Sequence, residues 1–121
     1  MVRIDTNYIV RYFVNDDPAM ADIAEKMLHS KRVYIANEII AEVVYVLSGV
    51  YDIDREVIAN LLLELIDFEN ILVSNPSVVS KSLEIYRSQK LDYVDCLLCA
   101  YGREDTIVTF DKKLKKCVKS I

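Results

Sequence analysis

The sequence predicts an α/β fold in three layers, with a central parallel sheet of about four strands and helices on both of its faces. Short runs of β-branched and apolar residues alternate with longer helical runs along the chain. Because parallel strands need crossover connections, this alternation is typical of strands joined by helices. The 121 residues are 53% hydrophobic and 28% charged, which suffices for one buried core. Residues 1–121 are therefore predicted to form a single domain.

The first third of the chain contains two predicted strands and two predicted helices. The apolar run Val2–Ile4 is predicted to be the first strand, and residues 8–14 the first helix. Asp17 followed by Pro18 predicts the start of a second helix, because Asp accepts a bond from a free backbone N–H and Pro fits the first turn. Val33–Ile35 is the second predicted strand.

The middle of the chain predicts two further helices and a strand. Asn37 is the predicted cap of a helix that is apolar around most of its circumference, which indicates burial. Another helix is predicted over residues 54–68, because its leucines and isoleucines recur at helical spacing. The run Ile71–Val73 is the third predicted strand.

The last third predicts two helices, a strand and a basic tail. Pro76 begins one predicted helix, and Asp92 caps the next, which ends near Gly102. Thr106–Thr109 is the fourth predicted strand. The tail either guides phosphate groups or forms a solvated helix face. Its lysines are Lys112, Lys113, Lys115, Lys116 and Lys119.

The charge of the chain limits the classes of function. There are 15 Lys and Arg against 19 Asp and Glu, a formal net charge of −4. A protein that holds nucleic acid mainly by a basic surface depends on many Lys and Arg contacts, so an avid general binder is excluded. A nuclease with an acidic, metal-loaded site is not excluded, since the metal supplies the positive charge that phosphate meets.

Composition also predicts the location of the protein. No run of about 18 apolar residues exists to span a membrane, and the first residues lack the basic-then-apolar layout of a secretion signal. Three cysteines are an odd number and too few for a disulfide scaffold, so we expect a reducing, cytoplasmic interior. Cys96 and Cys99 have a Cys-x-x-Cys spacing, but zinc needs four ligands, and packing inside a helix is the better explanation.

Four carboxylates stand where the apolar pattern does not favour them. Asp5 follows the first predicted strand and Asp111 the fourth, at the strand ends where open parallel sheets place their ligands. Glu42 and Asp95 are each the only charged residue of an apolar helical segment. An ionised group among apolar residues needs a cationic partner. If the four carboxylates converge, a divalent cation explains them.

Each of these acids also has a structural interpretation. Asp5 and Asp111 are suited to cap the helices that follow them. Glu42 is equally well placed on a narrow solvent-facing stripe with Glu38 and Tyr45. Their joint placement, rather than any single residue, favours a shared site.

The same segments resemble the motifs of PIN-domain ribonucleases, the family of VapC-type toxins. Asp5-Thr6-Asn7 after an apolar strand is similar to the opening motif, and Glu42 in an Ile-Ala-Glu-Val helix is similar to the second acid. Residues 91–100 are similar to the third motif, an Asp followed by a small-residue helix. Residues 108–111 are similar to the fourth, a strand that ends in Thr-x-Asp. The motifs occur in order across nearly the whole chain.

The resemblance implies a nuclease that binds Mg²⁺ or Mn²⁺ and hydrolyses RNA, leaving a 5′-phosphate. Oxygen ligands select such cations. It implies that Asp5 and Asp95 are the firmest metal ligands and that Glu42 and Asp111 complete or orient the catalytic site, with a carboxylate available to take a proton from the attacking water. The implied supporting residues are Asn7, Asp92 and Thr109.

The resemblance also implies protein partners. PIN toxins commonly form dimers, and a cognate antitoxin covers their active site. The first and fourth predicted helices offer apolar surface for a homodimer. The residues concerned are Tyr8, Ile9, Tyr12, Phe13, Ile58, Leu62 and Leu63.

Three alternatives belong to other classes. A phospho-receiver domain needs an Asp at the end of a mid-chain strand, whereas Asp52 and Asp54 follow a helix. An aspartate-nucleophile phosphatase needs Asp-x-Asp, and the third position here is Asn7. The remaining alternative is a catalytically silent PIN fold that acts through protein partners.

Overall fold

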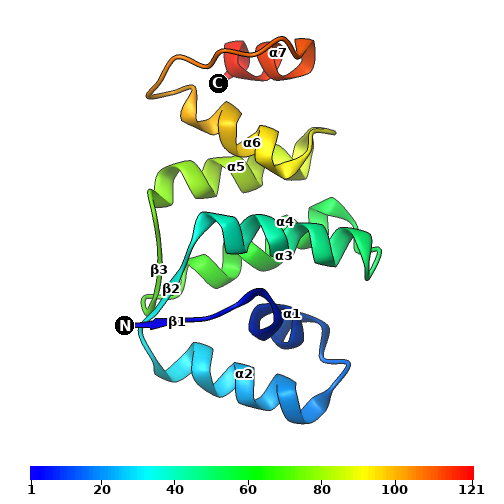
Figure 1. Cartoon of the computed structure of the whole chain (residues 1–121), viewed down its shortest axis with the longest axis vertical. Helices are drawn as coiled ribbons and strands as arrows, with labels where there is room; N and C mark the ends of the chain where they lie inside the picture. Colours follow the sequence, from blue (N-terminus) through cyan, green and yellow to red (C-terminus); the bar gives the residue numbers. More distant parts are fainter.

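The computed structural model describes residues 1–121 and contains three strands and seven helices (Figure 1). Figure 1 shows the helices stacked along the long axis, with α1 and α2 toward one end and α7 at the other. The elements in chain order are β1 (Val2–Arg3), α1 (Thr6–Val14), α2 (Pro18–Ser30), β2 (Val33–Ile35), α3 (Asn37–Gly49), α4 (Arg55–Ile66), β3 (Ile71–Val73), α5 (Pro76–Ser88), α6 (Tyr93–Tyr101) and α7 (Lys112–Ser120).

The three strands form one parallel sheet in the order β1-β2-β3. Val33 of β2 lies opposite Val2 of β1 on one side and opposite Ile71 of β3 on the other. Val33 and Ile35 of this central strand are fully buried. The predicted α/β class is thereby confirmed.

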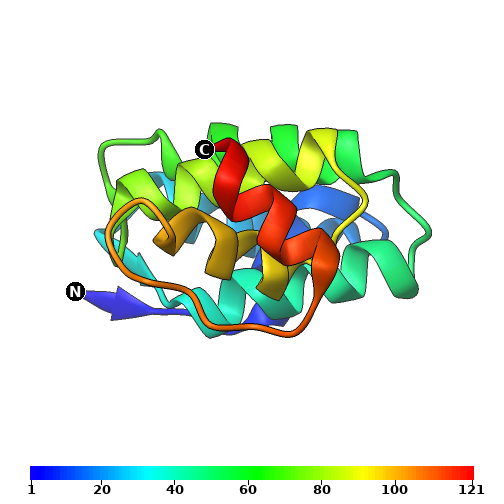
Figure 2. The same cartoon turned by 90° about the horizontal axis from the view of Figure 1, so that it is seen from above.

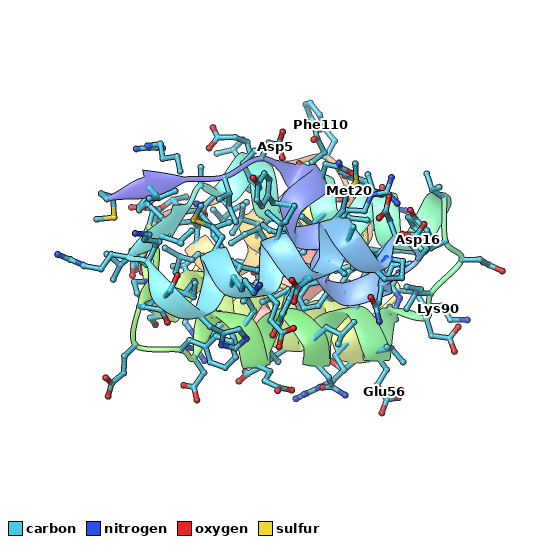
Figure 3. All side chains as sticks on the ribbon, turned by 90° about the horizontal axis from the view of Figure 1, so that it is seen from below. Asp5, Asp16, Met20, Glu56, Lys90 and Phe110 are labelled. Carbon is cyan, nitrogen blue, oxygen red and sulfur yellow. A yellow bond between two sulfur atoms is a disulfide. The ribbon has the colours of Figure 1, made fainter.

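The predicted fourth strand is absent, which corrects the expected count of four strands to three. Residues 106–110 belong to the connection between α6 and α7 and pair with no strand. Val108 and Phe110 are 90% and 100% exposed, and Phe110 projects from the surface in Figure 3. A β-branched run fits a sheet, but it becomes a strand only where a neighbour completes its backbone hydrogen bonds. The placement of helices on both sheet faces stays a prediction.

Local signals set several helix starts. Asp17 caps α2 by accepting from a backbone N–H three residues on, and Pro18 is the first residue of that helix, as predicted. The first helix begins directly after Asp5 rather than near residue 8, because the Asp5 side chain caps it. Ala36 occupies the cap position of α3 without a side-chain bond, so Asn37 is the first residue of α3 and not its cap.

Packing is mainly helix on helix around one core. A cluster of 27 buried residues receives side chains from all seven helices. In space, α1 packs against α2 and α3, α5 packs against α4 and α6, and α6 packs against α7. Seen along the long axis in Figure 2, α7 crosses over α6 and the connection between them sweeps around the edge of the molecule. No helix is both long and apolar enough to cross a membrane.

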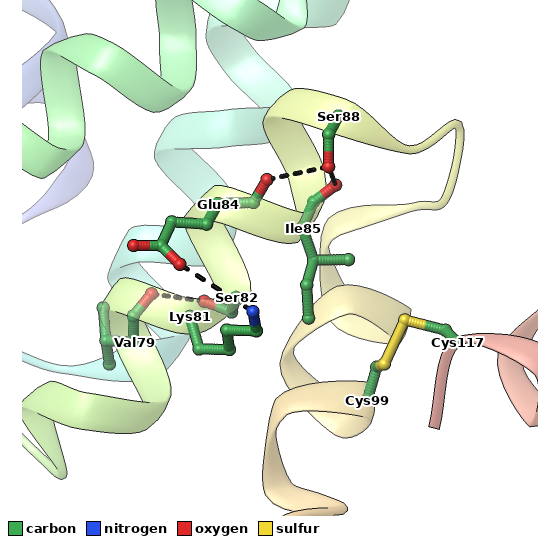
Figure 4. Close-up of polar contacts among 8 residues, drawn as sticks. All are labelled: Val79, Lys81, Ser82, Glu84, Ile85, Ser88, Cys99 and Cys117. Carbon is green, nitrogen blue, oxygen red and sulfur yellow. Dashed lines mark hydrogen bonds and ion pairs between the residues drawn. A yellow bond between two sulfur atoms is a disulfide. The ribbon is translucent and has the colours of Figure 1, made fainter. Parts of the chain in front are cut away.

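A disulfide between Cys99 and Cys117 ties α6 to α7 (Figure 4). Both cysteines are buried, and their Cα atoms lie 6.1 Å apart. Cys96 is buried and free. The prediction of simple packing inside a helix is therefore confirmed for Cys96 and wrong for Cys99. An odd cysteine count does not reveal a pair that only the contact between two helices brings together.

Candidate active site

The first group of predicted site residues lies between α1 and α3. Asp5 follows β1, and its Oδ1 accepts a hydrogen bond from the backbone N–H of Tyr8 at 3.3 Å. The side chain is exposed and sits at the surface where β1 leads into α1 (Figure 3). Because only Oδ1 is used by the cap, Asp5 keeps a second carboxylate oxygen for a ligand.

Glu42 of α3 is joined to this group through a residue that the sequence analysis did not assign. The Oγ1 hydroxyl of Thr6 donates to Glu42 Oε1 at 2.5 Å, and Thr6 is only 7% exposed. With Asp5 and Asn7, these two residues line a hollow of about 270 Å³. The sequence does point to Thr6, because Thr6 stands inside the opening motif between Asp5 and Asn7.

The exposure of Glu42 decides whether its side chain is buried, while its role in the site stays a prediction. Glu38, Glu42 and Tyr45 are all exposed, as expected for positions i−4, i and i+3 on one helix face. The inference of a carboxylate embedded in an apolar helix is therefore wrong, and the solvent-facing stripe is what the structure contains. The hydrogen bond from Thr6 nevertheless turns Glu42 toward Asp5 and the hollow.

A second acidic group lies where α6 and α7 begin. Asp95 is half-buried in the first turn of α6. Partial burial and the negative charges of Asp111 and Asp92 raise the pKa of the Asp95 carboxyl above its ordinary value of 3.8. Asp92 stands at the cap position of α6, but its side chain makes no capping bond, so its carboxylate stays free. Asp92 therefore does not have the side-chain cap role that the sequence favoured.

Asp111 is held by one hydrogen bond to its side chain and one from its backbone N–H. Its Oδ1 accepts from the backbone N–H of Leu114 at 3.0 Å and so caps α7. The Oγ1 atom of Thr109 accepts from the backbone N–H of Asp111 at 3.0 Å. Thr109 thus fixes the turn that presents Asp111, while the second Asp111 carboxylate oxygen makes no hydrogen bond within the chain.

The two acidic groups lie along a series of packed helices. Contacts run from α1 to α3, from α3 to α6 and from α6 to α7. Glu42 and Asp95 lie in α3 and α6, and Asp5 and Asp111 cap α1 and α7. The expectation that Asp5 and Asp111 meet at one sheet edge depended on the fourth strand. Without that strand, Asp111 begins a helix instead of ending a strand.

The donor chemistry of both groups suits a hard divalent cation. No three His, Cys, Asp or Glu side chains are grouped as a complete metal site. Mg²⁺, however, is usually held by one or two carboxylates and keeps several waters. In the second group a cation would also offset the repulsion that contributes to the raised pKa of Asp95. The residues present therefore fit an ion held by few protein ligands.

Comparison with protein families adds to this geometry. The family model of the PIN domain matches residues 2–119, a span that includes both acidic groups and almost every element of the fold. No curated protein and no solved structure gives a significant match.

Proposed function

This chain belongs to the PIN domain family, whose members are generally nucleases, and on that premise we propose that it is a divalent-metal-dependent endoribonuclease. The observation that carries the proposal is the acidic group at the start of α6 and α7. There, partial burial and then the negative charges of Asp111 and Asp92 raise the pKa of Asp95, and three acids so placed are suited to a divalent cation.

We assign Asp5 and Asp95 as the first ligands of Mg²⁺ or Mn²⁺, and Glu42 and Asp111 as the acids that complete or orient the site. A bound ion supplies charge stabilisation to the phosphodiester and lowers the pKa of the attacking water. The chain itself contributes the fixed acids. Thr6 orients Glu42, and Thr109 shapes the turn before Asp111. Asn7 and Asp92 are the remaining supporting residues, because they stand beside Asp5 and Asp95 respectively.

The resemblance to VapC-type toxins supports a finer proposal. The protein would be the toxin of a VapBC-type pair, acting as a homodimer, with a cognate antitoxin over its site. The feature that supports it is the order of the four motifs along the chain, from Asp5-Thr6-Asn7 to Asp111.

A second candidate function is a PIN fold that binds protein partners without catalysis. One observation favours it: no three acids are grouped as a complete metal site. The two candidates differ in whether RNA is cleaved when metal is added.

The rate at which the Asp5→Asn variant cleaves RNA tests the nuclease proposal directly. Asn keeps the cap to Tyr8 but removes one negative charge, so we expect the single-turnover rate with Mn²⁺ to fall roughly 10²-fold. Asp17→Asn is the matched control, because Asp17 caps α2 in the same way outside the acidic groups. It should cleave like the wild type. EDTA should abolish cleavage in both the wild type and the control. No cleavage by the wild type with Mn²⁺ would favour the non-catalytic candidate. Cleavage that persists in EDTA or in Asp5→Asn would come from a contaminating nuclease or a different mechanism, and it would contradict the metal-dependent proposal.

A further inference from the structure

A basic groove lies between α7 and the connector that joins α5 to α6, and it includes neither acidic group. Its volume is about 430 Å³, within the range of ligand-binding clefts. The six lining residues are Gln89, Lys90, Leu91, Lys113, Lys116 and Ser120. Three are lysines and none is acidic, in a chain whose formal net charge is −4.

The charges of these lysines are not neutralised within the molecule. All three are exposed, and none takes part in an ion pair. The ion pairs of the chain use Arg11, Lys26 and Lys81 instead. Three ammonium groups around one hollow repel one another, and an anion placed between them removes that repulsion.

Both walls of the groove are anchored. The Arg55 guanidinium donates to the backbone carbonyls of Tyr86, Gln89 and Leu91, and it stacks 4.3 Å from the centroid of the Tyr86 ring. These bonds hold the connector that carries Lys90. The other wall, α7, is tied to α6 by the disulfide at Cys117. A groove with fixed walls loses little conformational entropy when it binds a ligand.

The helix geometry divides the basic tail into two sets. Lys113 and Lys116 are three residues apart, so they lie on the same side of α7 and face Lys90 across the groove. The other lysines of α7 are not part of its lining. They are Lys112, Lys115 and Lys119. Lys113 and Lys116 are therefore the lysines of the tail that are placed to meet a ligand in the groove.

We propose that this groove binds the sugar–phosphate backbone of single-stranded RNA. The lysine ammonium groups pair with phosphates, while Leu91 and the lysine methylene stems offer apolar surface to the ribose. Because the lining presents no set of groups that matches a base edge, binding is independent of sequence. The choice of RNA rests on the proposed nuclease function: a substrate repelled by two acidic groups needs a positive surface elsewhere on the molecule.

Fluorescence anisotropy with a fluorescein-labelled uridine 12-mer tests the proposal. EDTA is present throughout, so that no metal-dependent cleavage alters the probe. K113Q/K116Q should weaken binding at least 5-fold at low salt. Its plot of log K against log salt should be shallower by about 1.4, since each single-strand phosphate contact contributes roughly 0.7. Lys90→Gln should weaken binding through the opposite wall, which lies outside α7.

K115Q/K119Q is the matched control, because it removes the same charge from the same helix outside the groove. It should bind within about 2-fold of the wild type, and all variants should melt at the wild-type temperature. Equal weakening by the two double variants would overturn the groove in favour of diffuse charge. Displacement of RNA by polyglutamate as readily as by unlabelled RNA would assign the groove to an acidic protein. Groove-dependent binding to phosphatidylserine vesicles without RNA binding would assign it to a membrane. Both outcomes overturn the proposal.

The outcome for the groove is separable from the outcome for the nuclease. If RNA binds through Lys113 and Lys116 but neither the wild type nor any variant cleaves it, the groove proposal is supported and the nuclease proposal fails. If the wild type cleaves with Mn²⁺ and K113Q/K116Q binds RNA as the wild type does, the nuclease stands and the groove fails.

Discussion

At the level of single residues, the predicted site acids combine structural and ligand roles. Asp5 and Asp111 each use Oδ1 to cap a helix and keep the other carboxylate oxygen unbonded. A cap and a ligand had been alternatives for each residue, and a carboxylate has enough oxygens for both. Asn at either position preserves the cap and removes the charge, which makes Asp→Asn variants informative at this site.

Asp95→Asn should stabilise the protein without metal at neutral pH. The folded-state pKa of Asp95 is raised, so the stability contributed by its protonated form is present below pH 3.8 and is lost as pH rises through the folded-state pKa. At pH 7 the wild type bears the whole cost of this charge, and the variant does not. Thermal unfolding should show a higher Tm for Asp95→Asn at pH 7, with the difference shrinking toward pH 4. Mn²⁺ should raise the Tm of the variant less than that of the wild type.

Asp105→Asn is the control for the Asp95 prediction, because Asp105 is an exposed loop acid outside both acidic groups. It should change neither the Tm nor the response to Mn²⁺. The first turn of a helix favours an acid by about 0.3–1 kcal/mol, which opposes the predicted gain. A lower Tm for Asp95→Asn with a normal metal response would show that the helix dipole dominates and that Asp95 is structural.

At the level of elements, α6 and α7 act as one unit because the disulfide closes the chain between them. The unit carries Asp95 and Asp111, and α7 also forms one wall of the basic groove. The connection between the two helices has an exposed Val108 and Phe110 and pairs with no strand. The cross-link at Cys117 and helix packing, rather than strand pairing, therefore hold α7 against α6.

Reduction of the disulfide should lower the stability of the chain. Cys99 and Cys117 are 18 residues apart, and closing a loop of this length contributes about 3 kcal/mol. For a domain of this size, the Tm should fall on the order of 10 °C in a phosphine reductant. The variant C99A/C117A should melt at one temperature with or without reductant. A thiol count in denaturant without reductant should find one free cysteine, Cys96, and a count of three would contradict the disulfide.

At the level of the whole molecule, the surface predicted for association is only partly available. Ile9, Ile58 and Leu62 are fully buried in the core, so they cannot form an interface. Tyr12 and Phe13 instead line a hollow of about 550 Å³ between α1, α2 and α4, together with Phe68. Asp22, Glu25 and Glu64 also line this hollow, so its surface is mixed acidic and apolar, and the homodimer stays a prediction.

A homodimer should be visible in sedimentation at micromolar concentration. The apparent mass should rise with concentration toward twice the 13.9 kDa of the chain. Because the acids of this hollow would repel one another across a symmetric interface, high salt should screen that repulsion and should not dissociate the dimer. A mass of 13.9 kDa at every concentration and salt would rule out the homodimer, leaving the nuclease proposal untouched.

The sequence by itself determined the features that depend on neighbouring residues. The α/β alternation, the start of α2 at Asp17 and Pro18 and the cap roles of Asp5 and Asp111 follow from periodicity and from side chains that bond within a turn. The family followed from four short motifs in order, and the match over residues 2–119 agrees with it.

Only the tertiary structure decided which distant residues meet. It joined Thr6 to Glu42 and Cys99 to Cys117, left residues 106–109 without a strand partner, and brought Asp111 beside Asp95. The physical reason is that these outcomes depend on contacts between elements. A β-branched run or a cysteine has the same local character whether or not its partner lies beside it, and the partner's place is set by how the helices pack.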